Sequence, residues 1–152
     1  MTQDSLIKEE LYQQIRDIMP IACVDIVPIY HSKFLLAKRI NIPEKETWYV
    51  PGGRILIGES FLSSAKRKML EEIGLSVKLE SLTYLTTQET IFNLHNGTKH
   101  TINIVYKCSI KEEPLIRLDT SQFSDFNWFE KIDATWPEYI KKILLLSGFE
   151  KN

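Results

Sequence analysis

Apolar residues recur along this chain with the spacing of helices in some segments and of strands in others. Near the N-terminus they fall on one helical face, between an N-cap at Asp4 or Ser5 and a stop at Pro20. The predicted helices cover residues 5–19, 59–73 and 136–146, and the predicted strands cover residues 21–30, 33–40, 47–54, 76–88, 100–110 and 125–129. Such irregular alternation is typical of a mixed sheet between helices, which places the chain in the α/β class.

Prolines and glycines add local detail to this pattern. Pro28 predicts that the first strand lies at a sheet edge or contains a bulge, because proline cannot donate to a strand ladder. The third predicted strand ends in a turn at Gly52 and Gly53. Gly74 stands where a C-terminal cap would end the second helix, and Pro137 falls in the first turn of the last helix.

Length and composition indicate one globular domain over residues 1–152. The chain has 152 residues, of which 43% are hydrophobic and 26% are charged, enough apolar material for a single core. The formal net charge of -1 and a pI near 6.3 exclude the broad basic face that non-specific nucleic-acid binding requires. We therefore expect no nucleic-acid partner, and any phosphate recognition must be local.

The N-terminal segment and the cysteines indicate a reducing compartment. The segment has no basic stretch followed by an apolar one, and no window is long and apolar enough to cross a bilayer, so we expect a cytoplasmic protein without a membrane partner. Cys23 and Cys108 each lie in a strand-like apolar run without a second Cys or His at ligand spacing. Buried reduced thiols are therefore expected, not zinc ligands or a disulfide.

The charged residues that could bind a metal or act in catalysis concentrate on the second predicted helix. Its apolar stripe faces the sheet, and on the neighbouring stripe Arg67 and Glu71, and Lys68 and Glu72, form pairs spaced i,i+4. These pairs alone would be compatible with a solvated helix face. The helix follows Pro-Gly-Gly at residues 51–53, however, which brings backbone carbonyls and adjacent carboxylates together, and Mg²⁺ prefers such oxygen ligands.

The segment 53–75 resembles the Nudix box, G-x5-E-x7-R-E-U-x-E-E-x-G-U, in which U is aliphatic. Every fixed position matches except the Glu after the Arg, which is Lys68 here. The resemblance implies a Nudix hydrolase with an α/β/α sandwich fold, in which a mixed β-sheet is flanked by helices. It also implies that the box helix holds divalent cations, Mg²⁺ with Mn²⁺ as a substitute, which bridge a diphosphate of a small-molecule nucleotide substrate.

The resemblance assigns roles to individual residues of the box. Glu71 and Glu72 would be the carboxylates that bind the metal, with the backbone carbonyl of Gly52 as a partner ligand. Glu59 and Arg67 would form the pair that fixes the orientation of those carboxylates. The metal would neutralise the diphosphate and position or acidify water.

Lys68 removes one carboxylate and adds a positive charge, which favours a site with fewer metals. The GDP-mannose mannosyl hydrolases also lack that Glu, work with one cation, and break the bond between the sugar and the diphosphate. The segments 19–25, 34–39, 48–54 and 127–129 are similar to that subfamily in order and approximate spacing.

The subfamily resemblance extends the candidate site beyond the box. Arg39 and Arg54 would bind the diphosphate, since a guanidinium offers two charge-assisted hydrogen bonds. Asp25 would orient Arg39 or the sugar, and an aspartate within an apolar strand is costly to bury without a partner. Gln122 would add a side-chain oxygen to the cation.

The general base is the main departure from the mannosyl hydrolases. They place a histidine at the position of Phe123, and phenylalanine cannot accept a proton. His95, His100, Asp119 and Asp125 are the alternatives, and the sequence does not choose among them. Loss of a general base slows an enzyme by a factor on the order of 10² to 10⁴.

The sequence therefore favours hydrolysis of a nucleoside diphosphate-linked substrate, a nucleotide sugar such as GDP-mannose. Two alternatives stay open, a pyrophosphohydrolase that cleaves the phosphoanhydride of nucleoside diphosphate derivatives or dNTPs, and a catalytically weak nucleotide-binding protein. The base is not readable from the aromatic residues. The apolar face of helix 5–19 packs either on a second copy, as in a homodimer, or within one chain.

Overall fold

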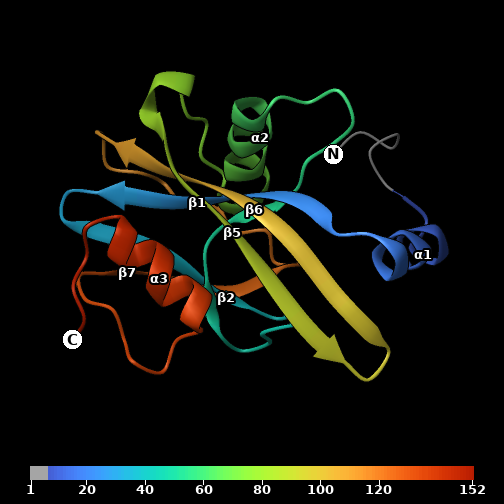
Figure 1. The fold of residues 1–152 in the computed structure, drawn as a ribbon. Coiled ribbons are helices and arrows are strands. Elements are labelled where there is room, and N and C mark those ends of the chain that lie inside the picture. The colour runs from blue at the N-terminus through green and yellow to red at the C-terminus, as the bar shows by residue number, and fades with distance from the viewer. Residues whose placement is uncertain (1–6) are drawn as a thin grey trace.

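The computed structural model describes residues 7–152 and contains a strongly twisted sheet between helices (Figure 1). The α-helices are α1 (Glu9–Ile18), α2 (Phe61–Ile73) and α3 (Glu138–Leu146), and a 3-10 turn, η2, covers Leu79–Ser81. The strands are β1 (Ile21–Tyr30), β2 (Lys33–Arg39), β3 (Trp48–Tyr49), β4 (Gly52–Arg54), β5 (Leu82–Leu94), β6 (Gly97–Ile110) and β7 (Phe123–Phe129).

The seven strands form one mixed sheet in the order β3-β2-β1-β6-β5, with β4 paired to β1 and β7 paired to β2. Only β1 and β6 run parallel, and they pair along the whole of β1, from Ile21 against Thr101 to Tyr30 against Ile110. Helices α2 and α3 lie on opposite sides of this sheet (Figure 1). The predicted α/β/α sandwich with a mixed sheet is therefore confirmed.

Alternation along the strands divides the apolar residues between two cores. Val24 and Ile26 of β1 face α2, whereas Val27 packs with the residues around α3. The core below α2 includes Ala65, Met69 and Ile73, the stripe expected from the helical pattern. Each face of the sheet is thus covered by one helix.

Helix α2 ends at Ile73 as its sequence predicts, and it begins at Phe61, two residues after the predicted start. The Ser60 side chain at the N-cap accepts a hydrogen bond from the backbone N–H of Ser63 at 3.1 Å. Gly74 ends the helix in the left-handed region with φ of 74°, and its N–H donates to the carbonyl of Leu70. These caps fix the register in which the charged residues of the helix face the sheet.

Two of the proline and glycine predictions for the first half of the chain were wrong. Pro28 lies on the inner strand β1, between β6 and the pair β4 and β2, and not at an edge. On the β4 and β2 side β1 pairs through residues 23–25 and then again from Ile29, so the missing N–H of Pro28 falls in the interval between two partners. Gly52 and Gly53 form strand β4 on β1, not a turn.

Other element boundaries shifted for local reasons. The strand predicted over 76–88 begins only at Leu82, because residues 79–81 form the turn η2. Pro137 is the N-cap of α3 and lies just before its first turn. Helix α1 begins at Glu9 with Lys8 at the N-cap, and the N-cap predicted at Asp4 or Ser5 lies outside the described residues.

Helix α1 lies against the sheet end near β6 without burying any of its residues. Leu11 is 52% exposed and Ile18 is 81% exposed, whereas Ile15 is half-buried, so the predicted apolar face is only partly covered within the described chain. The homodimer that this face suggested stays a prediction. Within residues 7–152 no helix is long and apolar enough to cross a membrane.

The N-cap of α2 yields a stability prediction. Ser60→Ala removes the acceptor for the Ser63 N–H, and should lower the free energy of unfolding by about 1 kcal/mol. Ser60→Asp keeps an acceptor and should stay close to the parent. Urea unfolding of the three proteins measures the difference, and equal midpoints for Ser60→Ala and the parent would contradict the assigned cap.

Candidate functional site

The candidate site is a pocket of about 100 Å³ where β1 separates from β2. Only Ile29 and Tyr30 of β1 pair with β2, so the first half of β1 faces β4 and leaves room beside it. This volume holds several waters or one small polar group, and a nucleotide would have to extend outward. The lining residues include Cys23, Asp25, Arg39, Tyr49, Gly52, Glu72, Phe92, Lys99, Asn103 and Phe123.

Glu72 joins helix α2 to the sheet at this pocket. Its Oε2 accepts a hydrogen bond from the Gly52 N–H at 2.8 Å, and its Oε1 lies 3.0 Å from the Nζ of Lys68. The residue is 6% exposed, and burial raises its pKa, although Lys68 and the Gly52 N–H oppose that rise. The carboxylate is thus held in place by one cation and one backbone donor.

The ammonium group of Lys68 lies between the two box carboxylates. Besides Glu72, its Nζ lies 3.4 Å from Glu71 Oε2, and its side chain is only 14% exposed. The Lys68 side chain also passes over Gly53, where an added Cβ would come within 2.8 Å of Lys68 Cε. Lys68 is therefore directed into the site and not into solvent.

Glu59 and Arg67 form the pair that the box pattern implies, although its role in orienting the other carboxylates stays a prediction. Arg67 Nη2 donates to Glu59 Oε2 at 3.0 Å and to the backbone carbonyl of Arg54 at 3.0 Å, and Nη1 donates to Glu71 Oε2 at 3.1 Å. Arg67 lowers the pKa of Glu59. One guanidinium thereby connects the start of the box, the end of β4 and a candidate metal-binding carboxylate.

Asp25 lies on β1 opposite Gly52 and is 7% exposed. Tyr139 of α3 donates a hydrogen bond to its Oδ2. Burial raises the pKa of Asp25 to about 7, and the neighbouring charge of Glu72 adds to the rise. A carboxyl group that titrates near neutral pH inside a pocket is typical of a functional group.

Gly52 has no room for a side chain. An added Cβ would lie 2.0 Å from Asp25 Oδ1 and 2.4 Å from the carbonyl oxygen of Val24. The absence of a side chain lets β4 approach β1 closely, and this approach brings the Gly52 N–H to Glu72. The contact between two candidate residues from distant parts of the chain therefore depends on this glycine.

The two candidate arginines occupy different surroundings. Arg39, at the end of β2, lines the pocket, donates from Nε to the Pro43 carbonyl at 3.0 Å and has its Cζ 5.3 Å from the centre of the Tyr49 ring. Arg54, at the end of β4, stacks over Tyr12 of α1 with 5.4 Å from Cζ to the ring centre. Only Arg39 belongs to the pocket lining.

Several sequence candidates do not reach the pocket. Gln122 is exposed, and its Oε1 accepts a hydrogen bond from Asn41 Nδ2 at 3.3 Å. Asp119 accepts from Ser121 in a turn, and the other base candidates, His95, His100 and Asp125, are not among the lining residues either. Phe123, at the position of the expected base, is 3% exposed and contributes an apolar wall.

Sequence reasoning missed Lys99, Asn103 and Tyr139, which belong to the site or contact it. Lys99, Thr101 and Asn103 occupy alternate positions of β6, so they share one face of the sheet and line the pocket. Polar residues at every second position of an apolar strand were the available signal for this face. Tyr139 had no such signal, because only the packing of α3 brings it to Asp25.

The donor set is of the kind that a divalent cation takes. Glu71, Glu72 and a backbone carbonyl are hard oxygen ligands of the kind that Mg²⁺ takes. Within residues 7–152 no group of three His, Cys, Asp or Glu side chains is placed to hold a metal. The Lys68 ammonium already neutralises part of the negative charge on the two carboxylates, so a metal ion bound there would have to displace it from Glu72.

The α/β/α sandwich, the box helix α2 and the paired carboxylates of Glu71 and Glu72 together define a protein of the Nudix type. A model of the NUDIX domain matches residues 19–145, and the chain belongs to the Nudix family of hydrolases. A crystal structure of a MutT Nudix hydrolase from Burkholderia pseudomallei has the same fold, with a TM-score of 0.73 at 21% identity over 84% of this chain and 98% of that one. The Nudix domain of NrtR from Shewanella oneidensis, solved with ADP ribose, gives a TM-score of 0.60 at 21% identity over 91% of this chain and 88% of that one.

Two curated relatives add sequence similarity. The low-salt glycan biosynthesis protein Agl8 of Haloferax volcanii is 27% identical over 142 residues, which are 91% of this chain and 88% of the relative. An ADP-ribose pyrophosphatase of Methanocaldococcus jannaschii is 38% identical over 63 residues, which are 41% of this chain and 37% of the relative.

The raised pKa of Asp25 predicts a pH-dependent effect of Asp25→Asn on stability. The pKa of Asp25 is about 7 in the folded protein and 3.8 in the unfolded chain. Ionisation of Asp25 therefore lowers the free energy of unfolding as the pH rises through that window. The variant lacks this loss. Its free energy of unfolding relative to the parent should increase by more than about 1 kcal/mol between pH 4.5 and pH 8.

Urea unfolding in EDTA at pH 4.5, 6 and 8 measures this difference. Glu72 shifts in the same direction but is present in both proteins, so it largely cancels in the comparison. A difference between variant and parent that stays constant from pH 4.5 to pH 8 would show that Asp25 is ionised throughout.

Proposed function

We propose that this protein hydrolyses a nucleotide sugar such as GDP-mannose with one divalent cation, Mg²⁺ or Mn²⁺, releasing the sugar and a nucleoside diphosphate. The observation that carries the proposal is the position of Lys68 between Glu71 and Glu72. A lysine at a half-buried position of the box, in place of a third carboxylate, leaves ligands and charge for a single cation. The likeness to a relative named for glycan biosynthesis also supports a sugar-bearing substrate.

In this proposal Glu71, Glu72 and the carbonyl of Gly52 hold the cation. When bound, such a cation neutralises the diphosphate and makes it a better leaving group. The Lys68 ammonium has to move off Glu72 for the carboxylate to bind metal, and its long side chain permits this. The role expected of Gln122 as an oxygen ligand stays a prediction, because its side chain is exposed and lies outside the pocket lining.

The remaining groups of the chain bind substrate and move the proton. Arg39 stands in the lining, where it can bind the diphosphate from the β2 side, and Arg54 lies beyond the rim at the end of β4. We assign proton acceptance from the attacking water to Asp25, whose pKa of about 7 suits a general base at neutral pH. Tyr139 holds one oxygen of Asp25 and fixes its orientation.

Cleavage of the phosphoanhydride is the second candidate. Both Glu71 and Glu72 are retained, and part of the chain resembles an ADP-ribose pyrophosphatase. Product analysis separates the two reactions. A sugar with a nucleoside diphosphate supports the first, whereas a sugar phosphate with a nucleoside monophosphate supports the second. A panel of nucleotide sugars and ADP-ribose, each with Mg²⁺ or Mn²⁺ and resolved by chromatography, is the direct test.

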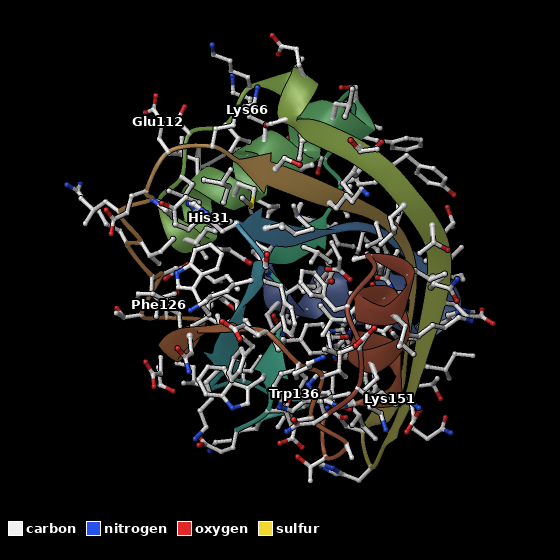
Figure 2. The ribbon with its side chains drawn as sticks, turned by 90° about the vertical axis from the view of Figure 1, so that its left-hand side faces the viewer. His31, Lys66, Glu112, Phe126, Trp136 and Lys151 are labelled. Atoms are coloured by element: carbon white, nitrogen blue, oxygen red, sulfur yellow. The ribbon has the colours of Figure 1, made fainter. Side chains whose placement is uncertain are left out.

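Glu72→Gln should lower metal-dependent turnover by about 100-fold or more, because it removes the charge of a ligand and keeps its shape. Glu112→Gln is the matched control, since Glu112 is exposed at the edge of the molecule (Figure 2). Steady-state rates across Mg²⁺ concentrations measure the effect. If Glu72→Gln retains near-parental rates at every Mg²⁺ concentration tested, Glu72 is not the principal ligand.

Lys68→Glu should raise the number of bound cations above one, because it places a third carboxylate beside Glu71 and Glu72. Without metal it should destabilise the protein by more than the roughly 0.2 to 0.5 kcal/mol of an exposed like-charge helix pair, since the site is largely buried. Lys66→Glu, on the exposed face of the same helix (Figure 2), is the control. Calorimetric Mn²⁺ titration gives the stoichiometry, and a parent that already binds several cations would contradict the proposal.

A further inference from the structure

The wall of the pocket formed by β6 carries two hydrogen-bond donors that the proposed mechanism does not use. Lys99 and Asn103 face the pocket from the same side of β6, with Thr101 between them. The Thr101 hydroxyl is engaged with that of Thr90 across the β5 pair. Strand β6 pairs with one side of β1, and β4, which carries Gly52, pairs with the other side. The β6 wall therefore faces the pocket from a different side than Glu72.

Lys99 places an ammonium group in the pocket wall without a carboxylate partner. Within the described chain no Asp or Glu oxygen lies within 4.0 Å of its Nζ, whereas Lys68 and Lys38 each have such a partner. Burial lowers the pKa of Lys99, and the positive charge of Arg39 lowers it further. Arg39 and Lys99 bring two cations to a pocket in which Asp25 and Glu72 balance them only from longer range, and this charge favours an anionic ligand at the β6 wall.

Asn103 supplies a second, independent observation. The residue is 4% exposed, and its Nδ2 has no hydrogen-bond partner among the described residues. Buried polar groups in native proteins are paired in the large majority of cases, so an unpaired amide donor beside a pocket points to an acceptor that enters from the pocket. Asn103 pairs with Cys23 on β1, and Asp25 lies two residues further along the same strand. It therefore adjoins the proposed reaction site.

We propose that Lys99 and Asn103 form a phosphate-binding wall, which donates to non-bridging oxygens of the substrate's diphosphate from the β6 side. The inference rests on the proposed function for the identity of the substrate. Both unpaired groups are donors and one is charged, which suits phosphate oxygens that only accept. A sugar hydroxyl, in contrast, also donates a hydrogen bond, and the Lys99 ammonium has no acceptor for it. Residues four apart on a strand have Cα atoms roughly 13 Å apart, a distance that the long lysine side chain can shorten.

The wall is tested by binding of inorganic pyrophosphate to the whole protein, measured by calorimetry in EDTA. Lys99→Gln should weaken binding about 10- to 100-fold, the equivalent of one charge-assisted hydrogen bond. Lys99→Arg keeps the charge and should stay within about threefold of the parent. Lys107→Gln, on the same strand outside the lining, is the matched control and should change nothing.

Asn103→Asp gives the sharper result, since it keeps the shape and replaces the amide donor by an acceptor. Binding of pyrophosphate should weaken at least 10-fold, with an unfolding midpoint in urea that shows a folded protein. Binding that is unchanged or tighter would mean that the occupant presents donors there, and would overturn the proposal. So would parental binding by Lys99→Gln, or a parent that binds no pyrophosphate.

Turnover separates this inference from the proposed function. In nucleotide-sugar hydrolysis Lys99→Gln should raise KM by a larger factor than it lowers kcat, because it removes binding and not proton transfer. A parent that binds pyrophosphate through Lys99 but hydrolyses no nucleotide sugar supports the wall and refutes the proposed function. A parent that hydrolyses nucleotide sugars with KM and pyrophosphate binding unaffected by either substitution refutes the wall alone.

Discussion

The close approach of β4 to β1 at Gly52 is the constraint on which the site depends. Because no side chain separates the two strands, the Gly52 N–H reaches Glu72 while Asp25 lies directly alongside. Helix α2 packs against one face of the sheet at this contact, and the core below α3 packs against the other face. The short strand therefore couples two layers of the sandwich, and the pocket opens where β1 turns from β4 to β2.

Charge in the pocket is arranged as carboxylates surrounded by cations. Asp25 and Glu72 are both buried, and burial raises the pKa of each. Lys68 contacts Glu72 directly, whereas Arg39 and Lys99 line the pocket and oppose the rise in the pKa of Asp25 from longer range. Isolated buried charges are costly, and on this basis we propose a metal at the carboxylates and a diphosphate at the wall.

Phe123 separates this protein from the mannosyl hydrolases that it resembles. At 3% exposure it closes the pocket with an apolar surface where those enzymes place a histidine. The replacement bases considered from the sequence are outside the lining, and Asp119 serves a turn. Asp25 is thus the candidate proton acceptor that the geometry favours, on a strand where the sequence suggested only an orienting role.

The sequence by itself determined the class of the fold, the C-terminal end of α2 at Gly74, and the spacing of Glu59, Arg67, Glu71 and Glu72. These features depend on local periodicity and on contacts within one helix, which a linear pattern records. The tertiary structure decided which polar residues share the pocket. Lys99 lines the pocket with Asp25, Tyr139 donates to Asp25 from α3, and Gln122 lies outside the lining, because strand register and helix packing bring distant segments together. Such long-range contacts leave no period in the sequence, and their physical basis is the burial of both faces of the sheet.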